Sequence, residues 1–203
     1  MIEYGMNYYD KLAQALAEHI WIVLLAMIIS LAIAAAFTVL CSLSRMAAGL
    51  LLPVFSVIYS VPSLAMLALF IPLTGLGTTT AIVVLVIYNQ YLMLRNFVSG
   101  LEAVDQSVTE AAVGMGMTPM QVLIRVRLPL AKKSLIAGIR ISLIATTGIA
   151  TIAASVNAGG LGVLLFDGLR TMNVAKILWG SILSAALALV LDGILLAAEK
   201  RFT

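Results

Sequence analysis

Long stretches of the chain carry no charged residue, and each is long enough to cross a bilayer as a helix. Residues 20–43 form the first such stretch, and no Asp, Glu, Lys or Arg occurs over residues 46–94. Because about 20 apolar residues span the hydrocarbon core as a helix, the second stretch is long enough for two crossings. The turn sequence TGLGT at residues 74–78 separates them.

Two more apolar runs follow, so the pattern predicts an all-α integral membrane protein with five spans. A polar segment at residues 102–133 separates the third span from the fourth, and a glycine-rich stretch at residues 157–162 separates the fourth from the fifth. We expect residues 1–203 to form one transmembrane domain. The predicted spans cover residues 20–43, 47–72, 78–95, 135–156 and 177–198.

Composition strengthens this prediction and narrows the chemistry. The chain has 203 residues, of which 63% are hydrophobic and 10% charged, whereas soluble domains carry about 25% charged residues. Much of the apolar surface must therefore face membrane lipid. The single cysteine, Cys41, and the single histidine, His19, give no basis for a disulfide framework or a metal site rich in these residues. With a net charge of +3, a nucleic-acid partner is not expected.

The distribution of Lys and Arg predicts the orientation, because short cytoplasmic loops carry an excess of these residues. An odd number of spans places the richer loops and the C-terminus on one side. We therefore expect the N-terminus outside and the C-terminus in the cytoplasm. The cytoplasmic side carries Arg45, Arg95, Arg125, Arg127, Lys132, Lys133, Lys200 and Arg201, and the other side carries Lys11, Arg170 and Lys176.

Pro62 falls inside the predicted second span. Proline lacks a backbone donor and clashes with the preceding helical turn, so a kink or short break is expected there. The break is either a hinge or bend that lines a transport path, or a tolerated kink.

The polar segment between the third and fourth spans contains two helix-start signals. Ser107 and Glu110 have capping-box spacing, and the helix that they start should stop at the glycines of residues 114–116. Thr118–Gln121, which reads TPMQ, repeats the start signal, and the second helix should end at residues 128–129. Two short capped helices joined by a glycine elbow predict a compact knuckle on the cytoplasmic face.

The spacing in this segment resembles the EAA loop of type I ABC importer permeases, the MetI-like family. Glu110-Ala111-Ala112, three residues, Gly116, nine residues and then Val126-Arg127-Leu128-Pro129 match that signature except for Val126 in place of Ile. In that family the loop is a coupling helix that sits in a groove of a separate ATPase subunit. The alternative is a chance amphipathic loop. The resemblance implies that the ATPase-coupling residues are Glu110, Ala111, Ala112, Gly114, Gly116, Leu128 and Pro129.

Other segments resemble one branch of that family, the osmoprotectant permeases. They are SVPSLA at residues 60–65, YNQ at residues 88–90 and AGGLG at residues 158–162, whereas Lys132-Lys133 departs from the usual apolar residue and proline. These permeases import glycine betaine, choline and carnitine across the bacterial plasma membrane. The resemblance implies ABC ATPase subunits, a second permease copy or paralogue and an extracytoplasmic substrate-binding protein as partners.

No G-x-x-x-x-G-K-[ST] phosphate loop occurs in the chain, so any ATP must be used by a partner, and neither a cofactor nor a catalytic residue is expected. One alternative is a permease of the same architecture for another small solute, such as ergothioneine or an amino acid. A remote alternative is an intramembrane enzyme. His19 and Asp192 are predicted near opposite faces, which argues against a Ser–His–Asp arrangement.

Two sets of residues within the predicted spans invite specific interpretations. Arg140 and Asp192 either pair across the fourth and fifth spans near the inner mouth, or reach separately toward water. Aromatic faces attract trimethylammonium groups, although aromatic residues in such spans are more often packing residues or interface anchors. The aromatic candidates for a substrate path are Phe55, Tyr59, Tyr88 and Tyr91.

The glycine-rich stretch between the fourth and fifth spans includes Gly159, Gly160 and Gly162. Non-helical backbone at membrane depth persists only where protein shields it or where it lines a water-filled cavity. We expect an outer gate or a landing site for the substrate-binding protein, and the alternative is a plain exposed loop.

Overall fold

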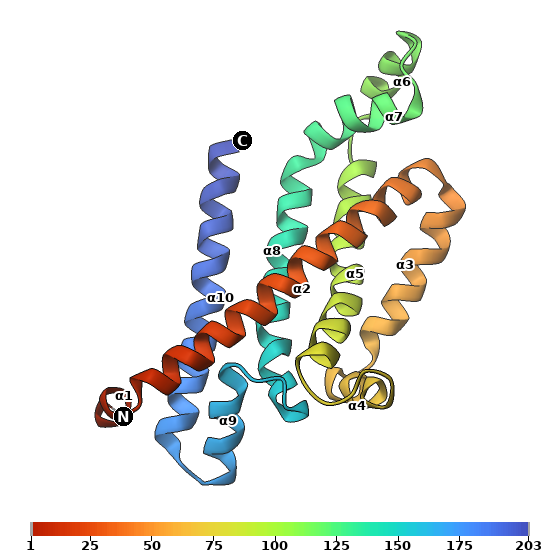
Figure 1. The fold of residues 1–203 in the computed structure, drawn as a ribbon. Coiled ribbons are helices and arrows are strands. Elements are labelled where there is room, and N and C mark those ends of the chain that lie inside the picture. The colour runs from red at the N-terminus through yellow and green to blue at the C-terminus, as the bar shows by residue number, and fades with distance from the viewer. Residues whose placement is uncertain (1, 203) are drawn as a thin grey trace.

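Figure 1 shows the computed structural model of the chain, which describes residues 2–202. Regular structure in this part of the chain is helical throughout. The helices are α1 (Ile2–Asn7), α2 (Tyr9–Leu43), α3 (Arg45–Ser60), α4 (Ser63–Thr74), α5 (Thr78–Glu102), α6 (Gln106–Gly114), α7 (Pro119–Val122), the π-helical turn η1 (Leu123–Arg127), α8 (Leu128–Ile152), the 3-10 turn η2 (Ala153–Val156), α9 (Leu161–Arg170) and α10 (Val174–Phe202).

Four helical stretches are long and apolar enough to span a membrane, and a bent pair makes a fifth. The bent pair is α3 with α4, whose axes differ by 100°. The result agrees with the predicted all-α fold with five spans. The four unbroken stretches are Tyr9–Leu43, Thr78–Glu102, Pro119–Val156 and Val174–Lys200.

The helices that contain the first and third predicted spans extend beyond the predicted boundaries. The helix α2 begins at Tyr9 rather than at residue 20, because Leu12 and Ala15 bury against other helices although the charged residues Asp10, Lys11 and Glu18 flank them. The helix α5 continues past residue 95 to Glu102, because Phe97 and Leu101 are buried on its inner face. Charge marks where a helix leaves lipid, but burial against neighbouring helices decides where it ends.

The second span is not one helix over residues 47–72, because the chain breaks at Pro62. Val61 has extended backbone angles (φ −68°, ψ 133°), as expected for a residue before proline, and Pro62 precedes the first residue of α4. The hydroxyl of Tyr88 donates to the Val61 carbonyl, which the break leaves without a helical partner. A break was predicted at this proline, but the pattern gave no sign of the 100° turn.

The core is built where α2, α5 and α8 meet, and it contains a polar network as well as apolar side chains. The Asn89 side-chain amide donates to the Ser30 hydroxyl (3.2 Å), and the Thr146 hydroxyl donates to the Asn89 carbonyl oxygen (2.9 Å). All three side chains are at most 2% exposed. Hydrogen bonds between helices replace the hydrophobic driving force that lipid does not supply, so this network fixes the register of three spans.

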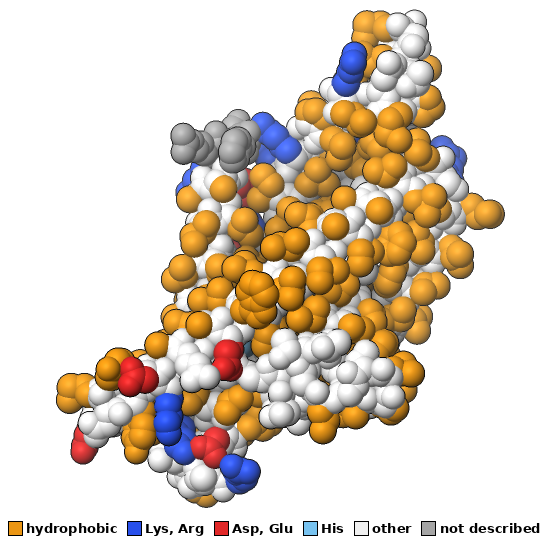
Figure 2. All heavy atoms as spheres, in the orientation of Figure 1, with side chains coloured by type: hydrophobic (Ala, Val, Ile, Leu, Met, Phe, Trp, Pro, Cys, Tyr) orange, Lys and Arg blue, Asp and Glu red, His pale blue; other side chains and the backbone are white. Residues whose placement is uncertain are grey.

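The two ends of the molecule carry different connections. The N-terminus, α4 and α9 lie at one end, whereas the α2–α3 junction, the knuckle of α6 and α7, and the end of α10 lie at the other (Figure 1). Figure 2 shows that charged side chains gather at the two ends of the visible face and that hydrophobic side chains cover the zone between them. This banding fits a membrane protein that crosses the bilayer several times.

Candidate coupling surface and translocation path

The helix α6 is capped by Asp105, and the capping box predicted at Ser107 is wrong. The Asp105 carboxylate accepts a hydrogen bond from the Ser107 amide (2.8 Å), so the helix starts at Gln106. The Glu110 side chain accepts from Gln106 (2.7 Å) instead of reaching back to a cap residue. The bond from the Ser107 amide stabilises the charged carboxylate and lowers the pKa of Asp105.

The elbow after α6 depends on one glycine in a left-handed conformation. The helix ends at Gly114, as expected, and Gly116 has a φ of +85°. Its amide donates to the Val113 carbonyl (2.9 Å), while the Met117 amide donates to the Ala112 carbonyl (3.2 Å). A residue with a side chain is strained at this φ, so the turn requires glycine at position 116 rather than at position 114.

The second helix of the knuckle starts as predicted but does not end at residues 128–129. Thr118 and Gln121 form a capping box, in which the Gln121 amide donates to the Thr118 hydroxyl (3.3 Å) and the Thr118 amide to the Gln121 side chain (2.8 Å). The π-turn η1 then joins α7 to α8, because the Leu128 amide donates to the Leu123 carbonyl and Pro129 falls in the first turn of α8, where its missing donor is tolerated.

The knuckle exposes apolar side chains at the end of the molecule. Of the residues expected to contact an ATPase, Glu110 and Ala111 are exposed, whereas Ala112 is buried (2%) and closes the elbow from inside. Gly114, Gly116 and Pro129 are exposed, and Leu128 is half-buried. Contiguous exposed apolar surface marks an interaction site. The exposed apolar residues of this knuckle patch are Val108, Val113, Met115, Met120 and Ile124.

At the opposite end, the loop between η2 and α9 is largely buried, since Ala158 and Gly160 are buried, Gly159 is half-buried and Asn157 alone is exposed. The Gly160 amide donates to Glu18 (3.1 Å), and the Thr78 hydroxyl donates to the Ala158 carbonyl (3.3 Å). Gly159 and Gly160 have φ values of +88° and +76°. The structure therefore does not contain the plain exposed loop, and the backbone is shielded by protein.

Gly162 is not a loop residue, contrary to the prediction, because α9 already begins at Leu161. A Cβ atom at position 162 would lie 1.9 Å from the Thr151 carbonyl oxygen. The glycine thus permits close contact between the start of α9 and the end of α8, and it has no role in turning the chain.

His19 is a buried residue that the sequence analysis left without a role. Its Nδ1 accepts from the Leu161 amide (3.3 Å), so Nε2 carries the proton and donates to the Thr147 carbonyl (3.2 Å). The side chain is 0% exposed. His19 therefore ties α2 to both α8 and α9, and only its place beside Glu18, just ahead of the apolar run, could have indicated a contact at this depth.

The aromatic candidates divide into two groups. Tyr59 contacts Tyr88 and Tyr91, with ring centroids 5.5 Å and 5.1 Å apart. Phe55 instead packs on Phe37. The Tyr91 ring already lies under the Arg95 guanidinium, 5.9 Å from the ring centroid. Tyr88 is 3% exposed, and the Arg95 guanidinium already lies over the Tyr91 ring. The geometry therefore fits packing better than an open site for an ammonium group.

Arg140 and Asp192 lie side by side and form a two-pronged ion pair. The Arg140 Nε and Nη2 atoms lie 2.7 Å and 3.0 Å from the two Asp192 carboxylate oxygens. Its Nη1 lies 3.1 Å from Glu199, a partner that the sequence did not suggest. Such forked geometry is the strongest form of ion pair, so this cluster fastens α10 to α8.

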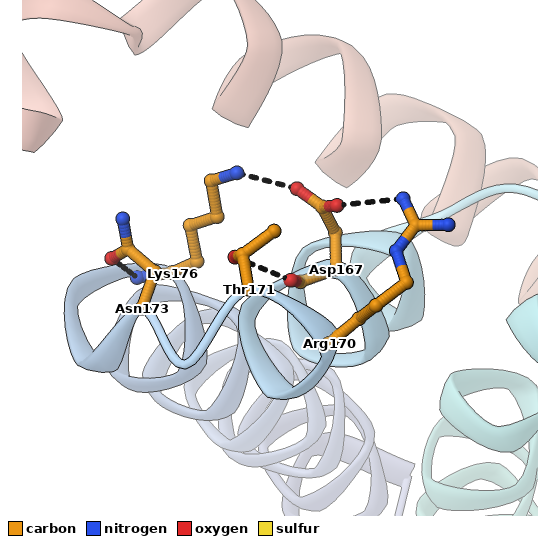
Figure 3. Close-up of polar contacts among 5 residues, drawn as sticks. All are labelled: Asp167, Arg170, Thr171, Asn173 and Lys176. Carbon is orange, nitrogen blue, oxygen red and sulfur yellow. Dashed lines mark hydrogen bonds and ion pairs between the residues drawn. The ribbon is translucent and has the colours of Figure 1, made fainter.

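Figure 3 shows a second charged cluster, which closes the turn between α9 and α10. Asp167 pairs with Lys176 and with Arg170 (3.0 Å), and the Asn173 side chain accepts from the Lys176 amide (3.2 Å). The hydrogen bond from Lys176, followed by that from Arg170, lowers the pKa of Asp167. Over the described residues, no group of three or more His, Cys, Asp or Glu side chains could hold a metal ion.

These features define a class of protein. Several apolar spans surround a polar core, and a capped two-helix knuckle projects between the third and fourth spans, as in the membrane-embedded component of a transport system. The chain belongs to the family of binding-protein-dependent transport system inner membrane components, whose model matches residues 26–203.

Known members of the family are similar over nearly the whole chain. The choline transport system permease protein OpuBB of Bacillus subtilis (strain 168) is 39% identical over 92% of this chain and 86% of its own length. The carnitine transport permease protein OpuCB of Listeria monocytogenes is 39% identical over 92% of this chain and 85% of its own length. A chain of the inward-facing MetNI methionine ABC transporter shares the fold, with a TM-score of 0.87 over 97% of this chain and 98% of that chain, at 22% identity.

Proposed function

We propose that this chain is the permease subunit of an ABC importer for quaternary ammonium osmoprotectants such as choline, carnitine and glycine betaine. The observation that carries the proposal is the knuckle patch on a helix that continues into a span. The substrate class is supported by the two permeases that are 39% identical over 92% of the chain.

The knuckle has the properties of a docking element for a cytoplasmic ATPase. Its two helices are capped by their own residues, Asp105 and Thr118, so the shape does not depend on a partner. Its apolar residues nevertheless face outward, which is unfavourable in water and favourable against a protein surface. Since α7 continues without interruption into α8, a push on the knuckle displaces a span.

We infer that two such subunits line the path and that the buried loop at the opposite end forms part of the outer gate. In this arrangement the N-terminus lies outside, and the knuckle and C-terminus lie in the cytoplasm. ATP binding by the partner moves the knuckles, and an extracytoplasmic binding protein delivers the solute. The permease itself contributes no catalytic group and uses no cofactor.

The test is a Gly116→Trp variant in proteoliposomes that contain the permease, its ATPase and its binding protein. We expect choline or carnitine uptake to be abolished, because the left-handed φ of Gly116 excludes the side chain and the elbow must change shape. Gly193→Ala is the control, since a Cβ at that helical position meets no atom within 4 Å.

Uptake by the Gly116→Trp variant at the level of the Gly193→Ala control would contradict the coupling role. Calorimetry on the binding protein tests the substrate class separately. Binding of choline, carnitine or glycine betaine supports it, whereas exclusive binding of ergothioneine or an amino acid contradicts it and leaves the coupling role untouched.

A further inference from the structure

We propose that Arg127 is a positioning residue that carries movement of the knuckle from η1 into the ends of α2 and α5. The proposal rests on the coupling role proposed above for the knuckle. It adds a specific mechanical link between that element and the remaining core of the membrane domain.

The contacts of Arg127 reach the ends of two spans. Its Nη2 and Nε donate to the Leu101 carbonyl at 2.9 Å and 3.3 Å, and its Nη1 lies 3.5 Å from the Ser42 hydroxyl. Leu101 is in the last turn of α5, where carbonyls lack helical partners and a cation is favoured. Ser42 is at the end of α2. One guanidinium therefore caps α5 and contacts α2.

The surrounding packing holds Arg127 in this position. It is the last residue of η1, between Leu123 (1% exposed) and Ala131 (3% exposed), which form one apolar cluster with Leu101. A π-turn within a helix is uncommon and occurs often at functional sites. Here the π-turn places Arg127 where its guanidinium contacts both α2 and α5.

A hollow separates α6 from these same ends, whereas η1 and α8 pack directly on α5 and α2. The cavity, of about 420 Å³, is lined by residues of α2, α5 and α6 together with Arg127. Glu110 of the EAA segment lies on one side of it, and Ser42 lies on the other. The main contacts of α6 are with α7 and η1. Movement of the knuckle reaches α5 through residues 103–105, and it reaches both α2 and α5 through η1 and α8. Arg127 adds a polar bridge from η1 to the ends of both spans.

The partners of Arg127 in this bridge are a carbonyl and a hydroxyl, both neutral. Hydrogen bonds to neutral oxygens are weaker than forked ion pairs such as that of Arg140 with Asp192. The Arg127 bridge can therefore break and re-form during a transport cycle, whereas the Arg140 cluster keeps α10 on α8. The weaker bonds of Arg127 therefore suit a contact between helices that move relative to one another.

The experiment compares variants of the complete complex, which contains permease, ATPase and binding protein, in lipid nanodiscs. Three quantities are measured: assembly with the ATPase, basal ATP hydrolysis, and stimulation of hydrolysis by the substrate-loaded binding protein. For Arg127→Gln we expect assembly and basal hydrolysis to persist and stimulation to fall about tenfold, a typical coupling loss.

Two further variants make the result independent of folding failure. Arg127→Lys keeps the charge but not the fork, so its stimulation should fall between the wild-type and Arg127→Gln levels. Ser42→Ala removes only the 3.5 Å contact and should reduce stimulation about twofold. Arg125→Gln, an exposed neighbour on the same turn, is the control for charge and should be stimulated like the wild type.

Wild-type stimulation in both Arg127 variants would overturn the proposal. If Arg127→Gln fails to assemble, the Arg127→Lys and Ser42→Ala variants test the proposal instead. Wild-type stimulation of ATP hydrolysis in both variants would overturn the bridge, and a graded loss of stimulation would support it. A wild-type permease that binds no ATPase would instead overturn the proposed function, so the two failures are distinguishable.

Discussion

The two glycine-containing connections that flank the fourth span have opposite designs. The knuckle satisfies its backbone with its own side chains, Asp105 and Thr118, and turns apolar residues outward. The loop before α9 obtains its partners from α2, through Glu18 and His19, and is buried. Similar composition therefore gives a self-contained module at one end and an integral part of the core at the other.

The difference indicates how substitutions should act at each end. A change at the buried loop removes contacts between spans and should lower stability. A change at the knuckle leaves the core untouched and should affect coupling more than folding. The predictions below test this separation, beginning with the largest effect.

Gly162→Ala should cause the greatest loss of stability, about 3 kcal/mol or more, because the added Cβ would meet the Thr151 carbonyl oxygen at 1.9 Å and neither backbone can move freely. Thermal unfolding in detergent, followed by size-exclusion chromatography, measures the loss. Gly148→Ala on α8 is the control, since its Cβ meets no atom within 4 Å. Equal stability of the two variants would show that the close contact between the start of α9 and the end of α8 does not stabilise the protein.

His19→Ala should destabilise the protein by about 2 kcal/mol, because the buried Leu161 amide loses its acceptor. His19→Asn retains an oxygen near the position of Nδ1 and should recover part of the loss. Denaturant unfolding of both variants in the same detergent gives the difference. A His19→Ala variant as stable as the wild type would show that α2 does not hold the loop.

Asp105→Ala should have the smallest effect, confined to faster amide hydrogen exchange in α6, with unchanged exchange in the core. The pH dependence has a defined sign. Because the folded-state pKa of Asp105 lies below its ordinary value of 3.8, the cap is fully present above that value and is lost as pH falls through the lower, folded-state value. Protection of the α6 amides, taken relative to their intrinsic exchange rates at each pH, that does not change between about pH 2 and 5 would contradict this.

Much of the fold could be predicted because lipid imposes a simple rule on sequence. The apolar runs located the spans, and the capping signals of Thr118 with Gln121 and the position of Gly116 located the knuckle. These signals are local, since each depends on residues within a few positions of one another. The break at Pro62 was predictable for the same reason.

The remaining features depend on contacts between residues far apart in the chain. No residue near Pro129 in the sequence indicates that the helix continues past this proline by way of a π-turn. The role of His19 requires Leu161 and Thr147, which lie in two other helices. The capping signal at Ser107 failed for a different reason, because the carboxylate of Asp105 competes for the same amide. Tertiary contacts and competing local signals thus limited the prediction of the site.

The uninterrupted helix Pro119–Val156 has a mechanical consequence. Thr146, held by Asn89 in the core, divides it into arms of about 40 Å toward the knuckle and about 15 Å toward the far end, at 1.5 Å per residue. A rotation of the helix about this point would move its short arm, beside His19 and the glycines, less than its long arm and in the opposite direction.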